Sequence, residues 1–458
     1  MKIRFFTFIL LFAVQHIFAQ IEGTWKGDLS IQGIKLPLVI EIESGENGYK
    51  STLYSPKQSS QGFPTSKFTF ENSELFFENK LLQAQYKGTL KDGKITGTFT
   101  QGGMNMPLIL EKAEKTAAQA HSVPNIGNRE INTEKLTRYI EYFAEKQHGV
   151  GSVSISRNGK KIYQKSFGQN QLPHQNYNEN TGYQIGSITK LFLATMIMQD
   201  VEKGKLNLSD KLSKFYPHLP NADKITLKNM LNHTSGLGDY VGETGEWLMN
   251  ETVSEKMVLD SIAKQGVLFE PNEKVKYSNS AYYLLCKILE KKHKKPFNVL
   301  LKDRITKKLG LKNTFSVLDY PKNIFASYQF TDGKYVLVKD FNFVNALGAG
   351  DITSTTDELN VFIQALFSGK LLKKETVQMM LPVDSNFGLC VMKVPFYNQT
   401  YYGHGGTTLG TDALMAYNPT DDIAISVCVN GRGLYSTNEF NIGILSIIYD
   451  EPFEFEKE

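Results

Sequence analysis

Hydrophobic and polar positions follow different periods in different parts of the chain, and each period predicts a different kind of element. Residues 21–112 contain short alternating runs such as LPLVIEIES, separated by turn signals such as Asp92-Gly93, and show no helical period. Residues 187 to about 310 show helical patterns, and strand-like runs such as FGLCVMKV and IAISVCVN return towards the end. The pattern therefore predicts an all-β segment, a mainly helical block and a late group of strands.

The helical block is enclosed by elements that predict a sheet. Before it, TEKLTRYIEYFAEKQHG predicts an amphipathic helix, and GVGSVSISRNGKKIYQKSFG predicts two strands joined at Asn158-Gly159. The apolar face of that helix consists of Leu136, Tyr139, Ile140 and Phe143. After the late strands, a closing helix is expected from about Thr437. We therefore expect one sheet assembled from both ends of the domain, with the helical block as a second lobe.

These patterns divide the chain into four segments. Residues 1–20 predict a signal peptide, 21–112 a small all-β domain that is barrel-like, 113–130 a linker with Pro124 and Gly127, and 131–458 the large domain. The first segment, MKIRFFTFILLFAVQHIFAQ, has a basic start, an uncharged core and a small residue near its end. Its apolar run is shorter than the roughly 20 residues that span a bilayer, and no later run reaches that length. We expect an exported protein, periplasmic or secreted, without an integral membrane segment after signal removal.

Composition and charge narrow the classes of function. The 458 residues are 41% apolar, 21% charged and 12% aromatic, which is typical of a soluble globular protein. The net charge of +4 comes from 51 basic and 47 acidic residues, and this balance argues against a nucleic-acid partner. Cys286, Cys390 and Cys428 all lie in apolar runs and are expected to be small buried side chains. Whether Cys390 and Cys428 form a disulfide stays open.

The first chemical candidate is the tetrapeptide from Ser187 to Lys190. It follows the strand-like Tyr183–Gly186 and opens the apolar run ITKLFLATMIMQD, in which Lys190 is the only ionisable group before Gln199. In a helix, residues three apart share a face, so the hydroxyl and the amine can meet. Burial lowers the pKa of a lysine and enables it to take a proton from serine. The second copy of this spacing, Ser261 to Lys264, follows charged residues and is typical of a solvated helix face.

Two further candidates follow along the chain. Tyr277 and Asn279 precede an apolar helix, where a phenol with its pKa lowered by a nearby cation can relay protons and an amide can hold a substrate amide. Their alternative interpretation is a helix N-cap with a packing tyrosine. Later, His404-Gly405-Gly406-Thr407 lies on a predicted strand, where glycines allow a substrate to approach the backbone. Its alternative is a glycine-rich bend with a surface histidine.

The three motifs together resemble the serine β-lactamase-related hydrolases: class C β-lactamases, D-Ala-D-Ala carboxypeptidases, D-aminopeptidases and related esterases. Ser187-x-x-Lys190, Tyr277-x-Asn279 and His404-Gly405-Gly406 occur in the family's order, and ITLKNMLNHTSGLGDY and AGDITSTTDELNVF also resemble the family. The resemblance covers roughly residues 130–450. It implies an α/β β-lactamase/transpeptidase-like domain: an antiparallel sheet flanked by helices, with a helical lobe and the site between the lobes. The leading segment resembles a small lipocalin-like domain.

The resemblance also implies roles for the motif residues. Ser187 would be the acylated nucleophile, Lys190 would help to deprotonate it, and Tyr277 would carry the proton to the leaving group and activate the deacylating water. Asn279 would orient the substrate's amide. The N–H groups of Ser187 and Thr407, beside Gly406, would form the oxyanion hole. Such hydrolases need no metal or other cofactor, and the sequence has no HExxH motif.

One departure from the family bears on the substrate. Many β-lactamases have lysine where this chain has His404, a side chain that we expect to be only partly charged near neutral pH. This resembles the D-amino-acid-specific peptidases and some esterases of the family. Arg432 could supply a compensating cation for a substrate carboxylate, or it is a solvated turn residue.

The sequence therefore predicts an exported serine hydrolase directed at D-amino-acid peptides or amides, with cell-wall peptide as one possible source of substrate. A carboxylesterase or a class C-like β-lactamase, acting on an ester or a β-lactam at the same site, are alternatives. A non-catalytic penicillin-binding sensor is a more remote one.

Overall fold

A computed structural model describes most of the chain after residue 20. The described residues are 21–31, 34–45, 48–56, 62–79, 82, 84–101, 104–114, 122–146, 149–172, 177–242, 251–338, 342–382, 387–431, 437–453 and 455. Contacts group the chain into two units, one formed by residues up to 126 with 395–400 and 442–458, the other by 127–394 with 401–441. The sequence pattern did not indicate that two late segments would join the first unit. The predicted signal peptide lies outside the described residues.

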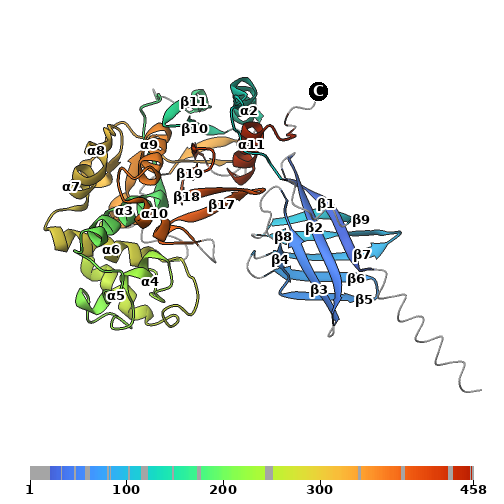
Figure 1. Ribbon diagram of the computed structural model, residues 1–458, viewed down its shortest axis with the longest axis horizontal. Helices are drawn as coiled ribbons and strands as arrows, with labels where there is room; N and C mark the ends of the chain where they lie inside the picture. Colours follow the sequence, from blue (N-terminus) through green and yellow to red (C-terminus); the bar gives the residue numbers. More distant parts are fainter. Residues whose placement is uncertain are drawn as a thin grey trace, which may run out of the picture. The chain divides into compact units, whose positions relative to one another are not determined.

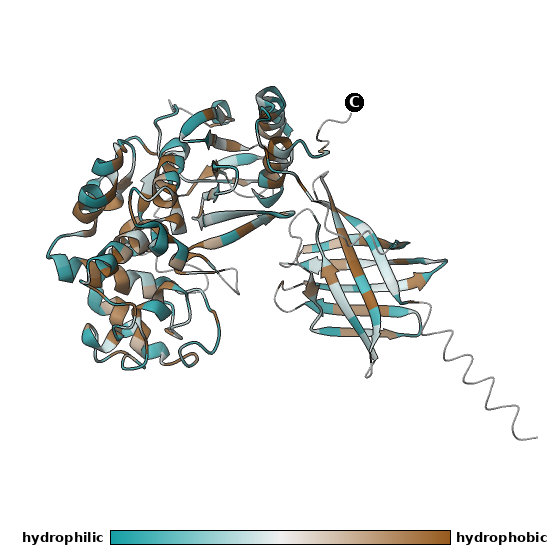
Figure 2. Cartoon of the chain, viewed as in Figure 1, coloured by the Kyte–Doolittle hydropathy of each residue, from teal (hydrophilic) through white to brown (hydrophobic). Residues whose placement is uncertain are grey.

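The first unit is built on one antiparallel sheet of nine strands, in the order β4-β3-β2-β1-β9-β8-β7-β6-β5. Its strands are β1 (Gly23–Ile31), β2 (Ile34–Gly45), β3 (Gly48–Tyr54), β4 (Phe63–Pro64), β5 (Lys67–Glu71), β6 (Glu74–Asn79), β7 (Ala84–Lys91), β8 (Lys94–Gln101) and β9 (Met104–Ala113). Apolar and polar residues alternate along these strands (Figure 2). One face therefore forms a core that includes Trp25, Phe77 and Tyr86.

The connections of this sheet explain its curled form. Each strand pairs with its neighbours in sequence except β4 and β5, and the first strand pairs with the last, at Thr24–Lys26 of β1 and Glu111–Ala113 of β9. The two edge strands, β4 and β5, are joined directly along the chain. The sheet is therefore an up-and-down meander that curls into a half-barrel, which confirms the predicted all-β, barrel-like module. The hairpin predicted at Asp92-Gly93 is also confirmed.

A six-stranded antiparallel sheet in the order β11-β10-β20-β19-β18-β17 belongs to the second unit except for residues 395–400, the end of β17 and the start of β18, which are grouped with the first unit. Its strands are β10 (Val150–Arg157), β11 (Lys160–Phe167), β17 (Met392–Phe396), β18 (Gln399–Thr407), β19 (Thr411–Asn418) and β20 (Ile423–Asn430). Strands from both ends of the large domain thus share one sheet, as predicted. All eight residues of β20 are buried, so both faces of the sheet are covered there. Helix α9 packs on one face, and α2 lies on the other side (Figure 1).

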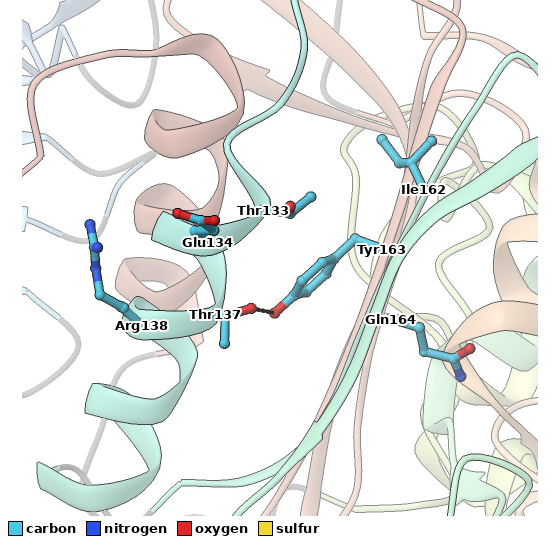
Figure 3. A pocket seen from close by; sticks show the side chains of 7 residues that line it. All are labelled: Thr133, Glu134, Thr137, Arg138, Ile162, Tyr163 and Gln164. Carbon is cyan, nitrogen blue, oxygen red and sulfur yellow. Dashed lines mark hydrogen bonds between the residues drawn. The ribbon is translucent and has the colours of Figure 1, made fainter.

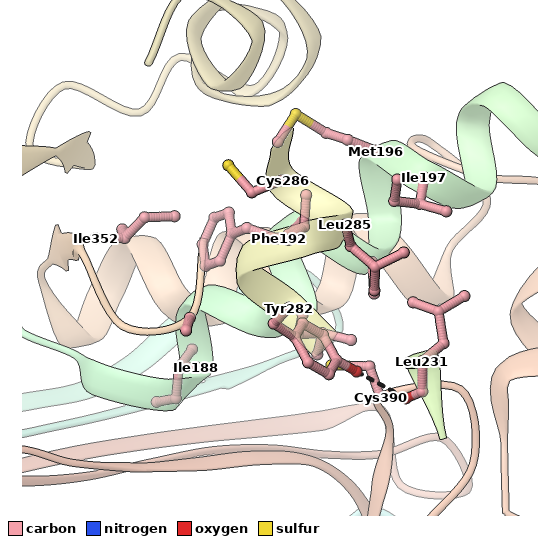
Figure 4. Packing of buried hydrophobic residues seen from close by; sticks show 14 of the residues in the cluster. Ile188, Phe192, Met196, Ile197, Leu231, Tyr282, Leu285, Cys286, Ile352 and Cys390 are labelled. Atoms are coloured by element: carbon pink, nitrogen blue, oxygen red, sulfur yellow. Dashed lines mark hydrogen bonds between the residues drawn. The ribbon is translucent and has the colours of Figure 1, made fainter. Parts of the chain in front are cut away.

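Helices α3 to α10 lie along the chain between β11 and β17, whereas α2 precedes β10 and α11 follows β20. Their bounds are α2 (Thr133–Lys146), α3 (Thr189–Glu202), α4 (Leu227–Leu231), α5 (Glu255–Gln265), α6 (Asn279–His293), α7 (Phe297–Leu301), α8 (Lys307–Leu309), α9 (Thr356–Phe367), α10 (Lys374–Met380) and α11 (Thr437–Tyr449). Every residue of α3 from Thr189 to Asp200 is buried, as its all-round apolar pattern predicted. Phe192 and Met196 of α3 pack beside Leu285 and Cys286 of α6 in the core (Figure 4).

Short elements connect the helical lobe to the sheet. A small sheet joins β12 (Tyr183–Gln184), β16 (Ile352–Ser354) and β13 (Phe315–Ser316), and a hairpin joins β14 (Tyr328–Thr331) to β15 (Lys334–Leu337). Because β12 leads into α3 within a few residues, the small sheet fixes where α3 begins. All three cysteines are buried and free, which confirms the expectation of small buried side chains and leaves Cys390 and Cys428 unpaired. Among the described residues, no helix combines the length and apolar character needed to cross a membrane.

A buried polar network links α9 to the sheet, and we expect its loss to destabilise the protein. The Asn360 amide donates to the hydroxyl of Ser154 at 3.2 Å and accepts from the hydroxyl of Ser426 at 2.8 Å. We expect Asn360→Ala to lower the free energy of unfolding by about 2–3 kcal/mol, because it removes the acceptor of the buried Ser426 hydroxyl and leaves Ser154 with only its 3.4 Å contact to Asp357. Urea unfolding followed by circular dichroism measures the change.

The control for this prediction is Val361→Ala, on the exposed side of the same helix. It should change the free energy of unfolding by no more than about 0.5 kcal/mol. Equal effects of the two substitutions would contradict a stabilising role for the network.

Candidate active site

Ser187 lies in the short 3-10 turn Gly186–Ile188, directly between β12 and α3. The turn begins at Gly186, whose φ of +52° is in the left-handed region that favours glycine. Ser187 is partly exposed, whereas Gly186 and Ile188 on either side of it are buried, as is Lys190. The fold therefore presents one hydroxyl to solvent at the N-terminal end of a buried helix.

Lys190 meets Ser187 as the three-residue spacing predicted. Its Nζ lies 3.1 Å from the Oγ of Ser187, 2.9 Å from the Oδ1 of Asn279 and 2.7 Å from the carbonyl oxygen of Ala349. The Lys190 side chain is fully buried, and burial lowers its pKa to about 7 while Asp239 and Cys390 oppose the shift. The amine is therefore available as a base near neutral pH.

The three contacts of Lys190 have different chemical meanings. The side-chain oxygen of Asn279 and the carbonyl of Ala349 can only accept a hydrogen bond, whereas a hydroxyl can accept or donate. In the neutral amine, two N–H groups donate to Asn279 and Ala349, and the lone pair then faces Ser187. The geometry thus points the basic electron pair at the hydroxyl proton.

Tyr277 lies beside this pair, at the end of the loop before α6. Its ring centroid is 4.8 Å from the Nζ of Lys190, and its hydroxyl interacts with the side chain of Ser187. Tyr277 as a whole is 37% exposed, but its hydroxyl is enclosed beside Ser187, and this local burial raises the pKa of Tyr277 well above its ordinary value. The condition under which the sequence pattern allowed a proton relay, a pKa lowered by a nearby cation, is therefore not met in the resting site, and Tyr277 is a neutral phenol.

His233 supports Tyr277 and was not singled out from the sequence. Its ring stacks on the ring of Tyr277 with centroids 4.4 Å apart, and its Nδ1 accepts a hydrogen bond from the N–H of Ser278 at 3.1 Å. Burial, and next the charge of Lys190, lower the pKa of His233 well below its ordinary value. A neutral histidine therefore holds the phenol in place. Ser278 also caps α6, so the predicted N-cap occurs together with the functional geometry.

Asn279 is held at both ends of its amide. Its Oδ1 accepts from Lys190, and its Nδ2 donates to the Oδ2 of Asp239 at 3.2 Å. The same carboxylate oxygen accepts from the backbone N–H of Asn279 at 2.8 Å. Because a carboxylate only accepts, Asp239 fixes which end of the amide faces Lys190. Asp239 is thus a functional residue that sequence reasoning missed.

Two glycines bring β18 against the turn that carries Ser187. A Cβ added to Gly406 would lie 1.9 Å from the carbonyl oxygen of Ile185 and 3.1 Å from the nitrogen of Ser187. A Cβ added to Gly186 would lie 2.9 Å from the nitrogen of Thr407. The backbone nitrogens of Ser187 and Thr407 are therefore neighbours only because both glycines lack side chains.

The N–H of Thr407 is free of its neighbouring strand β19. The N–H of Thr408 donates to the carbonyl of Thr411, and Thr407 stands opposite Asp412 in the next position of the ladder. Hydrogen-bonded and non-bonded pairs alternate in antiparallel sheets, so the N–H of Thr407 points away from β19. With the N–H of Ser187 it can form a two-donor site for an oxyanion.

His404 is buried on β18, and its charge state is not the one expected from the sequence. Burial lowers its pKa to about 4, with Lys190 adding to the shift, so His404 is uncharged at neutral pH rather than partly charged. Its Nδ1 lies 2.5 Å from the carbonyl oxygen of Gly405, which requires Nδ1 to carry the proton. This motif position supplies no cation. Arg432, the other candidate cation, lies outside the described residues.

The structure thus brings together five of the predicted side chains or backbone groups around one point: Ser187, Lys190, Tyr277, Asn279 and Thr407. An open groove elsewhere contains none of them. It lies between α2 and β11 and is lined by Thr133, Glu134, Thr137, Arg138, Ile162, Tyr163 and Gln164 (Figure 3). The catalytic candidate is therefore the cluster at the start of α3.

The fold and this cluster define a serine hydrolase of the β-lactamase-related type. The profile of the beta-lactamase family matches residues 136–442, which is more than half of the chain, and the chain belongs to that family. The sequence resemblance to these hydrolases is thereby confirmed.

Relatives and solved structures agree with this assignment. The chain is 29% identical to PbpX of Bacillus subtilis (strain 168), which is named as a penicillin-binding protein, over 74% of this chain and 84% of that protein. It is 30% identical to penicillin-binding protein 4* of the same strain, over 55% of this chain and 60% of that protein. The fold is similar to D-amino acid amidase from Ochrobactrum anthropi SV3, with a TM-score of 0.61 and 22% identity over 69% of this chain and 99% of that one.

The lowered pKa of Lys190 predicts the pH dependence of acylation. The neutral amine is the base, so kcat/KM should rise with pH and level off above about pH 7. Lys190→Met should lower kcat/KM by about 10²–10⁴-fold and abolish the rise. Steady-state rates between pH 5 and 9 measure both effects. Lys264→Met, in the exposed second copy of the motif, should leave the profile unchanged, and a similar loss there would contradict the assignment.

The close packing of Gly406 on Ile185 and Ser187 predicts the effect of a substitution on kcat. Gly406→Ala should lower kcat by about 10²–10³-fold, because its Cβ would push β18 away from Ser187 and displace the N–H of Thr407. Gly405→Ala is a matched control, since its Cβ would meet nothing closer than 3.7 Å. It should change kcat by less than about threefold. A wild-type rate for Gly406→Ala would exclude this oxyanion site.

Proposed function

We propose that the protein hydrolyses amides of D-amino acids through an acyl-enzyme on Ser187. The observation that carries this proposal is the buried amine of Lys190, which lies 3.1 Å from the Ser187 hydroxyl with a pKa near neutrality. Among the described residues no carboxylate forms an ion pair with Lys190, and such a lysine is costly to bury in an apolar helix. Its lowered pKa suits a base.

In the proposed acylation, the Oγ of Ser187 attacks the substrate carbonyl while its proton passes to the lone pair of Lys190. The developing oxyanion is bound by the N–H groups of Ser187 and Thr407. The C–N bond then breaks, and the leaving amine takes the proton of the Tyr277 phenol, which regains one from Lys190. The Tyr277 hydroxyl contacts the Ser187 side chain, whose Oγ lies 3.1 Å from the Nζ of Lys190, so the three groups of this proton path are adjacent.

Deacylation reverses the same path. Water attacks the ester carbonyl of the acyl-enzyme, and its proton passes through Tyr277 to Lys190. The C–O bond to Ser187 breaks, the serine oxygen recovers the proton, and a free carboxylic acid leaves. Because Tyr277 is a neutral phenol at rest, its role is to exchange one proton for another in each step rather than to remain as a phenolate.

The uncharged His404 supports an amide substrate over one that ends in a carboxylate. A lysine at this position would attract a carboxylate, whereas a neutral imidazole provides no charge for it. Amides and esters of single D-amino acids lack that group. The names of two proteins of similar fold, D-amino acid amidase and D-stereospecific amidohydrolase, accord with this proposal. The apolar segment at residues 1–20 supports export as a further part of it.

A substrate panel tests the proposal. The purified protein should hydrolyse D-alanine and D-phenylalanine amides at least about tenfold faster than the L-enantiomers, and faster than a D-Ala-D-Ala peptide or a chromogenic cephalosporin. Mass spectrometry with a reactive phosphonate should show one adduct on Ser187.

Ser187→Ala is the control and should show neither turnover nor adduct. Equal rates for D- and L-amides would contradict the stereochemical part of the proposal. Fastest turnover of the cephalosporin would instead indicate a β-lactamase, and fastest turnover of aryl esters an esterase.

A further inference from the structure

The carbonyl of Ala349 is the closest acceptor of Lys190, and its position depends on a short buried turn. Residues 347–351 connect the 3-10 turn Phe343–Ala346 to β16, and Gly348 in this turn has a φ of +71°. A Cβ on Gly348 would lie 2.4 Å from the Cβ of Cys286, so the turn packs directly on α6. The Ala349 carbonyl is thus set by the turn rather than by a helix or a sheet.

The side chain of Asp351 is hydrogen-bonded to the backbone of this same turn. One carboxylate oxygen accepts from the N–H of Gly348 at 2.8 Å, and the other accepts from the hydroxyl of Ser316 at 2.5 Å. The side chain is fully buried, and no cation pairs with it in the part of the chain that the structure describes. Two neutral donors therefore hold a carboxylate that the hydrolase chemistry does not itself use.

The same turn is tied to α3 beside the catalytic lysine. The N–H of Ile352, next to Asp351, donates to the Oγ1 of Thr189 at 3.0 Å, and Thr189 precedes Lys190. The N–H of Val317 donates to the carbonyl of Asp351 at 3.0 Å. Asp351 lies in the same turn as Ala349, two residues along the chain from the carbonyl that orients the base.

We propose that Asp351 is a positioning residue for Lys190: its ionised carboxylate holds the turn 348–351 so that the Ala349 carbonyl receives one N–H of the amine. Asp239 has the corresponding role on the other side of the amine, because it orients the amide of Asn279, the second acceptor of Lys190. With both acceptors fixed, the lone pair of the neutral amine can only face Ser187. The inference rests on the proposed role of Lys190 as base but not on the identity of the substrate.

The surroundings of Asp351 make this role sensitive to pH. Burial raises the pKa of Asp351 to about 6, against the hydrogen bonds from Ser316 and Gly348, and the charge of Glu290 adds to the rise. The other titratable groups that face it are Cys286 of α6 and Tyr240. A proton on the carboxyl turns one acceptor oxygen into a donor, so the Ser316 hydroxyl has to change from donor to acceptor, and the hydrogen bond from the N–H of Gly348 loses its charge assistance. The turn is therefore held less firmly as the pH falls through this pKa.

The test is the pH dependence of Ser187 labelling by a fluorophosphonate, which needs no identified substrate. In the wild-type protein, log of the labelling rate should rise with a slope of about one between pH 6 and 7, from Lys190, and about two below pH 6, from Lys190 and Asp351 together. Asp351→Asn should lower the plateau rate by about 10–100-fold and reduce the lower slope to one. A plateau and a slope of two like those of the wild type would overturn the proposal.

Two further variants separate positioning from a loss of folding. Ser316→Ala keeps the carboxylate but removes a hydrogen bond that lowers its pKa, so the change of slope should move to higher pH; an unmoved change of slope would also overturn the proposal. Asp319→Asn, on a nearby exposed carboxylate, should behave as the wild type in rate, slope and melting temperature. Wild-type protein that is not labelled at all would overturn the proposed function instead.

Discussion

The burial of one amine, that of Lys190, is the constraint on which the site depends. An ammonium group without a carboxylate partner is unfavourable in an apolar helix. Burial therefore lowers the pKa of Lys190 towards the neutral amine, and three hydrogen-bonding contacts surround its nitrogen. Two of these bonds go to oxygens that cannot donate. The arrangement leaves the Ser187 hydroxyl as the one partner to which the neutral amine can offer its lone pair, so the same burial that is costly for folding also defines the direction of proton transfer.

The titratable side chains around Lys190 are also mostly uncharged. Tyr277 is held as a phenol, and His233 and His404 are held as neutral imidazoles, in each case because burial opposes the charged form. A second fixed charge near Lys190 would change its pKa and with it the pH at which the base works. Asp239 is the exception that acts through Asn279 and partly offsets the effect of burial on Lys190.

Much of this could be predicted from local patterns in the sequence. The all-round apolar run from Leu191 to Met198 indicated a buried α3, and the distance from Ser187 to Lys190 follows from helical spacing alone. The hairpin at Asn158-Gly159 is where the turn signal placed it, with both residues at positive φ. Family resemblance then placed Tyr277 and Asn279 near the same point.

Other parts of the site could not be predicted, for two physical reasons. The Ala349 carbonyl is a backbone group, and any residue type would provide it, so no side-chain pattern reveals it. The charge states of Tyr277 and His404 depend on burial by residues far away in sequence, which a motif does not contain. Asp239 stood in a segment that resembled the family, yet its use became clear only from its two bonds to Asn279.

Helix α3 also has to be immobile for these short distances to persist. At its C-terminal end the buried carboxylate of Asp200 contacts His293 at 2.5 Å and Arg304 at 3.1 Å, and Arg304 also donates to the carbonyl of Met196. At the other end, Thr189 accepts from Ile352 of β16. A helix fixed at both ends cannot slide along its axis without breaking buried polar contacts. The position of the Lys190 backbone is therefore set by the lobe as a whole, and the local residues around the amine need only orient its last few atoms.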